Sequence, residues 1–468
     1  MAKLNFKKTM VVSVAAALSL SAQAQYLRSS YFMEGTSSRL QLNPGLQPSR
    51  GYFNIPVIGS LNVAANSNTL GVNDIVDIID GGGDIYMNNK LYDRLKTDNR
   101  LNVNLNTDLL SFGWFKGKNF WSVNVGVRVD AGARLNKGMF DFMRNVNGMA
   151  LEDLAGKKQH YNMSNQEVRA NAYGEVGLGF SRRLTEKLTA GVRVKALLGL
   201  ARAEMNIQHF EVDMDVPEVP QYGTEINEAD WIGKGYSYEA KGNVMTTMRG
   251  GGITFDQQGR IEDFEFEAKD LGLAGGGFGI DLGASYDVMD HLTVSASVLD
   301  LGFLKWSQHN TRMGDVEGKE DVVIDYSNYN QFIGGDFLSL ERFDFKEQKN
   351  VDYKSKTRLS STMILAAEYA LFDRKLSVGA MYSAHFVKPE ALHDVTFSAT
   401  YRPNTRINLA ASYSPVLAGG KSIGLAFKLG PLFAGTDYMY FGKNSKSVNG
   451  FIGLSVPLGG KKKDFSEL

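Results

Sequence analysis

One segment alternates between apolar and polar residues almost without interruption, from Phe120 to Leu135. Side chains of a β-strand point to opposite faces with a period of two residues, so this segment has one aliphatic face and one polar face. It is also longer than the roughly 5–6 residues of a common globular strand. Long strands with an aliphatic outer face and a polar inner face are typical of transmembrane β-barrels. The aliphatic face carries Val123, Val125, Val127, Val129, Ala131, Ala133 and Leu135, and the polar face carries Ser122, Asn124, Gly126, Arg128, Asp130, Gly132 and Arg134.

The same kind of pattern recurs along the chain, so we expect an all-β fold. The expected fold is a single transmembrane antiparallel β-barrel of about 14 strands. An even number of strands brings both chain ends to one side of the membrane. A soluble β-sandwich is the alternative, but it would not explain why short and long connections alternate. The other predicted strands are Gly51–Asn66, Leu101–Phe115, Val168–Arg182, Leu188–Met205, Phe278–Val288, Leu292–Leu304, Arg358–Leu371, Leu376–Phe386, Val395–Arg402, Ile407–Ser414, Ile423–Leu429, Leu432–Met439 and Gly450–Leu458.

The lengths of the connections predict which end of this barrel faces the periplasm and which faces the exterior. Outer-membrane barrels have short periplasmic turns and longer extracellular loops. The barrel domain is expected at residues 51–458, with long extracellular loops at 137–165, 206–274 and 305–357. Apolar residues at helical spacing in the first loop predict one or two short helices, which either pack over the barrel mouth or form a ligand-binding lid. The acidic second loop is interpreted as a solvated surface, with a calcium loop as the alternative, and an extra hairpin is possible within it.

The N-terminus predicts export. Lysines precede an apolar run from Met10 to Leu20, and Ala22-Gln23-Ala24 forms a small-residue cleavage pattern. The run is shorter than the ~20 residues of a membrane-spanning helix, so residues 1–24 are interpreted as a signal peptide rather than an uncleaved anchor. We expect the mature chain in the Gram-negative outer membrane, with residues 25–50 as a luminal hatch and 459–468 as a periplasmic tail.

Composition excludes several classes of function. The chain has no cysteine, so it has no disulfide framework and no thiolate nucleophile. Removing the three lysines of the signal peptide from 51 basic residues leaves 48 against 51 acidic ones, which gives no reason to expect nucleic-acid binding. The six histidines show no zinc-binding spacing, and no serine lies in a nucleophile elbow with a matching partner. We therefore expect no enzyme, no metal and no cofactor.

Charged residues at inward strand positions are the strongest candidates for a functional site. Neighbouring strands bring acids and bases together there, and buried charges need partners or solvent. One interpretation is a structural salt-bridge network that fills the lumen and binds the hatch; the other is a polar pathway for a solute. The predicted luminal charge network comprises Arg128, Asp130, Arg134, Arg169, Glu175, Arg193, Lys195, Asp281 and Glu368.

Two motifs suggest relatives. Asn43, Pro44 and Gly45, soon after the signal peptide, resemble the hatch motif of the long-chain fatty-acid transporters (FadL/TodX-like), although Gly45 replaces the usual alanine. The second motif, Asp300, Leu301, Gly302, Phe303 and Trp306, with the preceding glycine-rich strand at 274–286, resembles an uncharacterised Bacteroidetes family of outer-membrane β-barrels. That family is distantly similar to the PorP/SprF proteins of type IX secretion.

These resemblances imply two functions. The first is passive passage of a small hydrophobic solute across the outer membrane. The second is a non-transport role, as a scaffold or accessory subunit of a secretion or assembly complex. The expected partners are accordingly outer-membrane lipid, a hydrophobic small molecule, and secretion or assembly subunits. A barrel hydrolase is disfavoured because no Ser/His/acid arrangement falls on adjacent inward positions.

Overall fold

A computed structural model describes the chain over residues 28–55, 60–71, 74, 85–218, 231–325, 327–332, 338, 345–348, 355–386, 391–416, 421–437 and 446–461. The predicted signal peptide and the last seven residues of the predicted tail lie outside these ranges.

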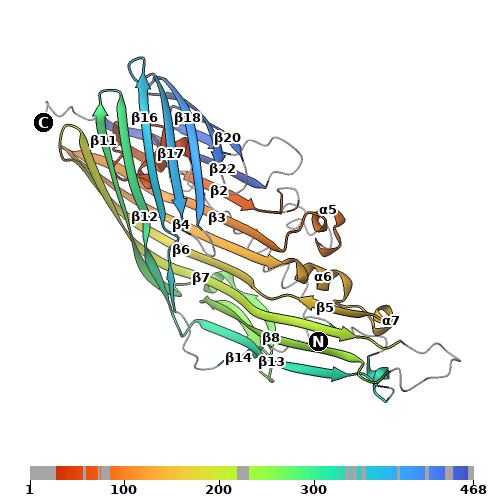
Figure 1. Cartoon of the computed structure of the whole chain (residues 1–468). Helices are drawn as coiled ribbons and strands as arrows, with labels where there is room; N and C mark the ends of the chain where they lie inside the picture. The colour runs from red at the N-terminus through yellow and green to blue at the C-terminus, as the bar shows by residue number, and fades with distance from the viewer. Residues whose placement is uncertain are drawn as a thin grey trace.

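The described strands form a closed antiparallel barrel of fourteen wall positions, as the sequence predicts (Figure 1). Closure is direct, because the last strand pairs with the first, which is made of two segments. The eighth position is likewise divided into two segments. The wall consists of β1 (Arg50–Asn54) with β2 (Ser60–Ser67), β3 (Asp98–Lys116), β4 (Asn119–Asn136), β6 (Gln166–Arg183), β7 (Leu188–Asp215), β11 (Gly275–Met289), β12 (Leu292–Trp306), β15 (Lys356–Arg358) with β16 (Thr362–Leu371), β17 (Leu376–His385), β18 (Leu392–Asn404), β19 (Ile407–Val416), β20 (Ser422–Leu429), β21 (Leu432–Thr436) and β22 (Ser447–Lys461).

The outer surface of the wall is apolar. Leu178, Val194 and Leu365 are 51%, 49% and 46% exposed, and each lies at a position where the sequence pattern predicts an outward side chain. Large aliphatic side chains in such exposed rows suit contact with lipid rather than water. The polar members of the same strands point into the lumen.

Two bulges interrupt the alternation on the inner face. In β3 the register shifts between Asp108 and Leu110, and in β12 the residues Leu299 and Asp300 together face a single residue of β11. Asp300 has φ of 60°, a left-handed conformation that is uncommon for residues other than glycine. A bulge re-aims the side chains around it, and the bulge of β12 places the carboxylate of Asp300 in the lumen.

The two ends of the barrel differ. Tight hairpins lie at one end, which we call the turn end, and a large extension lies at the other, the loop end (Figure 1). There β7 exchanges its neighbour β11, paired along 188–199, for β8 (Gly235–Met248), and β8 pairs in turn with β13 (Thr311–Val323). The remaining elements of the loop end are η1 (Ile85–Met87), α5 (Asn89–Tyr92), α6 (Lys137–Asn145), α7 (Leu151–Leu154), β5 (Lys158–Asn162), β9 (Gly251–Phe255), β10 (Ile261–Phe266), η3 (Ala268–Asp270), η4 (Tyr329–Gln331) and β14 (Lys346–Glu347).

This extension has a hydrophobic core of its own. α6 starts where the side chain of Asn136 accepts a hydrogen bond from the N–H of Gly138 at 2.8 Å. Its apolar face includes Phe142, which is fully buried together with Val212 of β7. Loops 137–165 and 206–274 therefore contain folded structure, including the two short helices and the extra hairpin that the sequence suggests. Within the described part of the chain, no helix is long and apolar enough to span a membrane.

Candidate functional site: a charged cavity beside a luminal plug

Residues 28–49, here called the plug, fold inside the barrel, as predicted for the hatch. α2 (Arg28–Tyr31) and α3 (Ser37–Leu42) are joined by a turn in which Gly35 has φ of 75°, a conformation suited to glycine. Tyr31, Phe32 and Met33 are buried against apolar residues of the inner wall. The contacted wall residues lie on β12 and from β16 to β22 and are Leu299, Ile364, Ala366, Met381, Ala410, Ala426, Phe433 and Phe451.

The Asn43-Pro44-Gly45 motif fixes the plug to β11 and β12. Nδ2 of Asn43 donates to the main-chain oxygens of Ala284 at 3.3 Å and Ala296 at 3.2 Å, and to the hydroxyl of Tyr31 at 3.0 Å. Its Oδ1 accepts from the N–H of Gly45 at 2.8 Å. A single side chain thus joins the plug to β11 and β12 and also stabilises the turn of its own motif.

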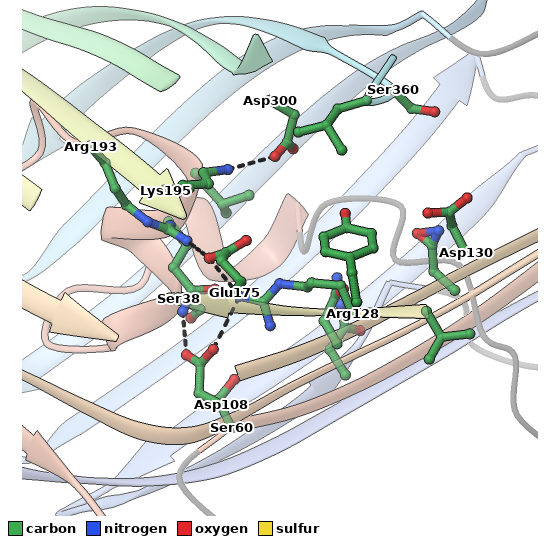
Figure 2. A pocket seen from close by; sticks show the side chains of 18 of the residues that line it. Ser38, Ser60, Asp108, Arg128, Asp130, Glu175, Arg193, Lys195, Asp300 and Ser360 are labelled. Carbon is green, nitrogen blue, oxygen red and sulfur yellow. Dashed lines mark hydrogen bonds and ion pairs between the residues drawn. The ribbon is translucent and has the colours of Figure 1, made fainter. Parts of the chain in front are cut away.

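A continuous row of ion pairs crosses six neighbouring strands of the wall, and we call it the ion ladder. Figure 2 shows its members Asp108, Arg128, Glu175, Arg193, Lys195 and Asp300. Arg128 contacts Asp108 at 3.1 Å and Glu175 at 3.3 Å. Arg193 contacts Glu175 and, at 3.7 Å, Asp281. Lys195 lies 2.7 Å from Asp281 and 2.5 Å from Asp300. Each cation therefore has two carboxylate partners, which is how buried charges are tolerated.

The ladder is also joined to the plug. The side-chain amide of Gln41 donates to Asp108, so the first carboxylate of the ladder is shared between the wall and α3. On the other side of the plug, Arg39 contacts Glu368 at 3.3 Å, and Glu368 contacts Arg402 at 2.5 Å. Arg402 reaches back to Glu34 of the plug at 3.2 Å. Charges thus tie the plug to the wall on two sides.

The nine charges proposed from the sequence divide into two groups. Arg128, Glu175, Arg193, Lys195 and Asp281 come together in the ion ladder. The other four lie outside it: Asp130 accepts a hydrogen bond from Asn171 at 2.9 Å, Arg134 contacts Asp98 at 2.9 Å, Arg169 contacts Glu167 at 4.0 Å, and Glu368 belongs to the second cluster around Arg39.

Sequence reasoning missed two ladder members, Asp108 and Asp300. Asp300 lies in the bulge of β12, where the period of two residues fails, whereas Asp108 immediately precedes the bulge of β3 and still follows the period. Asp300 was noted only as part of a family motif. Its carboxylate contacts Lys195, and its N–H donates to Asp281 at 2.7 Å. For Asp108 the signal available in the sequence was its place in the inward series Asn102, Asn104 and Asn106. Alternation alone would place Asp300 on the outward face.

The other members of the Asp300 to Trp306 motif have structural contacts. Phe303 packs edge-on against Phe278, with ring centres 5.6 Å apart, and Nζ of Lys356 lies 3.7 Å from its ring centre. Trp306 is buried with Leu197 and Leu304, and its Nε1 donates to Thr357 at 3.0 Å. Leu301 points outward and is exposed, and Gly302 accepts from the N–H of Leu359 at 3.1 Å.

A cavity of about 110 Å³ lies between the ladder and the plug (Figure 2). Ser38, Gln41 and Leu42 of the plug form one side of it. The wall side comprises Ser60, Asn62, Asn104, Asn106, Asp108, Arg128, Val129, Asp130, Tyr173, Glu175, Arg193, Lys195, Asp300, Leu359, Ser360 and His385. A second space of about 10 Å³ follows toward the turn end, and Gln41 and Arg193 line both spaces.

The cavity does not offer a metal site within the described residues, where no group of three or more potential ligands forms a cation-binding cluster. His385 faces the cavity, and its Nδ1 shares a hydrogen bond with the hydroxyl of Thr362 at 2.6 Å. The arrangement can hold a small polar molecule against fixed charges.

Solved outer-membrane proteins resemble the chain at low sequence identity. The toluene transporter TbuX of Ralstonia pickettii is 11% identical with a TM-score of 0.45, the match covering 94% of this chain and 99% of that one. The toluene transporter TodX of Pseudomonas putida is 10% identical with a TM-score of 0.36, covering 94% and 96%. A FadL homologue of Pseudomonas aeruginosa is 9% identical with a TM-score of 0.29, covering 93% and 97%.

No curated protein matches the chain. One family of sequences does, over residues 44–437, which include Pro44 and Gly45 of the hatch motif, the ion ladder and the Asp300 to Trp306 motif. The match extends over most of the barrel, and the chain belongs to this family of unknown function, DUF5723.

Proposed function

We propose that the chain is an integral outer-membrane barrel that lets a small solute into its lumen and past the plug. The observation that carries this proposal is the cavity between the plug and the ion ladder. A barrel that served only as a membrane anchor would need neither a luminal space nor a separate segment to close it. The second, smaller space beyond Gln41 and Arg193 supports a route toward the turn end.

The predicted signal peptide and the apolar outer wall support the location. A barrel has no unpaired strand edge, so its backbone is satisfied in lipid without water. The turn end would then face the periplasm and the loop end the exterior.

The lining of the cavity bears on the class of solute. Resemblance to the fatty-acid transporters predicts a hydrophobic solute, and this stays a prediction. The cavity itself is lined mainly by charged and amide side chains. Bringing an apolar molecule there would remove water from these groups without replacing its hydrogen bonds. The geometry therefore favours a solute that carries polar groups.

Removing the plug tests passage. Deletion of residues 28–42 from the mature chain should raise single-channel conductance in planar bilayers, because α2 and α3 occupy the lumen. A matched deletion of the β9–β10 hairpin, residues 251–266, which lies outside the barrel wall, should leave conductance at the wild-type level. Conductance unchanged by the plug deletion would overturn the proposal.

A second candidate function is a scaffold or accessory subunit of a secretion or assembly complex. The folded extension at the loop end favours it, since this extension has its own buried core and exceeds what a simple pore requires. A stoichiometric partner that co-purifies with the full chain, and is lost when β8 and β13 are removed, would support this role. Recovery of the barrel without partners would favour passage.

A further inference from the structure

The charges around the luminal cavity do not balance. The three cations Arg128, Arg193 and Lys195 are each already held by two carboxylates of the ladder. The carboxylates number five when Asp130 is included with Asp108, Glu175, Asp281 and Asp300. With the acids ionised and His385 neutral, the site carries two uncompensated negative charges.

Asp130 is the carboxylate that stands apart from the ladder (Figure 2). Its hydrogen bond comes from the neutral amide of Asn171, and within the described ranges no cation lies at ion-pair distance from it. Arg169 influences it electrostatically but makes its own ion pair with Glu167. Asp130 lines the same cavity as Asp300, so both carboxylates face a molecule bound there.

Two buried polar atoms of the lining also lack partners among the described residues. These are Oγ of Ser38, in a residue 3% exposed, and Oδ1 of Asn62, in a residue 5% exposed. A buried acceptor without a hydrogen bond costs free energy. Both atoms can accept a hydrogen bond, so a molecule bearing N–H groups would satisfy them together with Asp130.

The size and the aromatic lining limit the occupant further. A cavity of about 110 Å³ is somewhat smaller than the ~150 Å³ apolar cavity known to hold benzene, so it suits a molecule of at most about six non-hydrogen atoms. Tyr173 lines it as well, and the face of a tyrosine ring attracts cations within about 6 Å. Metal ions are disfavoured because the described acids form no ligand cluster.

We propose that the luminal cavity is a binding site for a small organic cation with primary ammonium groups, held by Asp130 and Asp300 and by the acceptors of Ser38 and Asn62. The inference rests on the proposed function, since it names the solute class for the same cavity. Anions are excluded from the site because every ladder cation is already paired.

The test uses three probes with the same four-carbon backbone and different charges: 1,4-diaminobutane, 1,4-butanediol and succinate. Their binding to the detergent-solubilised mature chain is measured by calorimetry. We expect the diamine to bind at least about tenfold more tightly than the diol, the effect of one moderate charge interaction, and succinate to bind most weakly. Equal binding of the three probes, or preference for succinate, would overturn the inference.

Variants locate the site. Asp130→Asn keeps the shape and removes one charge, so diamine affinity should fall about tenfold. Asn104→Arg places a guanidinium opposite Asp130 in the β3–β4 register and should abolish diamine binding. Asp321→Asn removes one carboxylate charge from the exposed loop end, far from the cavity lining, and should leave diamine affinity unchanged. Unaltered affinity in both luminal variants, with folding verified by heat-modifiable migration, would show that the diamine binds elsewhere.

Flux measurements separate this inference from the proposed function. Liposomes carrying the full mature chain are placed in each probe, with the plug-deleted barrel as the open-pore control, and swelling reports entry. Swelling in all three probes without diamine preference in calorimetry would refute the cation site and retain passage. Diamine binding without swelling in any probe would refute passage and retain the site.

Discussion

Gly283 of the barrel wall lies directly against Asn43 of the plug. A Cβ atom at Gly283 would overlap Oδ1 of Asn43 and lie 2.8 Å from Cδ of Pro44. Gly191 of β7 is similarly placed, because a Cβ there would lie 2.9 Å from the nitrogen of Gly45. The wall therefore lacks side chains where the hatch motif approaches it, and the contact depends on residues from three distant parts of the sequence.

Substituting Gly283 tests whether this contact keeps the lumen closed. Gly283→Val should displace the Asn43-Pro44 turn and raise single-channel conductance toward that of the plug deletion. Gly450→Val is the matched control, since a Cβ at Gly450 meets nothing within 4 Å. Equal conductance of the two variants would show that the hatch motif does not control closure.

The sequence predicted the wall well because its signal is local. A period of two residues assigns every regular strand and its lipid-facing side, and the exposed aliphatic residues follow it. The period of two residues could not predict that β7 continues to Asp215, because the part of β7 that lies in the loop-end extension packs against α6 rather than lipid. Strand pairing beyond the barrel depends on contacts between distant segments, which periodicity does not record.

The site was predicted only in part for a related reason. Alternation places Arg128 and Glu175 on the inner face, but only the register of neighbouring strands tells which charges meet. Asp300 was not predicted because the bulge of β12 changes the face on which its side chain lies. Asp108 continues the inward series of Asn102, Asn104 and Asn106, and only its partners in the ladder depend on the strand register. The plug contacts of Arg39 and Arg402 depend on how an irregular segment folds within the lumen, which no pattern in residues 25–50 reveals.

Glu175 is the carboxylate on which the ladder depends most. It accepts from Asn124 at 3.0 Å and pairs with both Arg128 and Arg193, and its side chain is 3% exposed. Glu175→Gln removes the shared charge and leaves two neighbouring guanidinium groups underpaired, so we expect a loss of about 3 kcal/mol in the free energy of unfolding.

The urea midpoint, followed by tryptophan fluorescence, measures this loss. Asp213→Asn is the control, because Asp213 is 65% exposed in the loop-end extension and pairs with His160. That variant should shift stability by less than about 1 kcal/mol. Similar midpoints for the two variants would contradict a stabilising role for the ladder.

An inserted arginine distinguishes the two faces of the wall. Val194 of β7 points outward and is half exposed, so Val194→Arg should cost about 2–4 kcal/mol near the bilayer midplane. Asn104 points into the cavity opposite Asp130, and Asn104→Arg gains a partner there. The fraction of heat-modifiable folded barrel in liposomes should fall for the first variant and stay near wild type for the second. Equal losses would mean that the inner and outer faces are assigned wrongly.

Cysteine labelling tests the orientation of the barrel in the membrane. Lys319 lies at the loop end and Lys187 in a tight turn at the opposite end, and both are exposed. A predicted signal peptide delivers the chain from the periplasm, and short turns of such barrels remain on that side. Lys319→Cys should therefore react with a membrane-impermeant maleimide on intact cells, whereas Lys187→Cys should react only after the outer membrane is permeabilised. The parent chain has no cysteine, so it supplies an unlabelled background. Labelling of Lys187→Cys alone on intact cells would show that the barrel has the reverse orientation, with its loop end facing the periplasm.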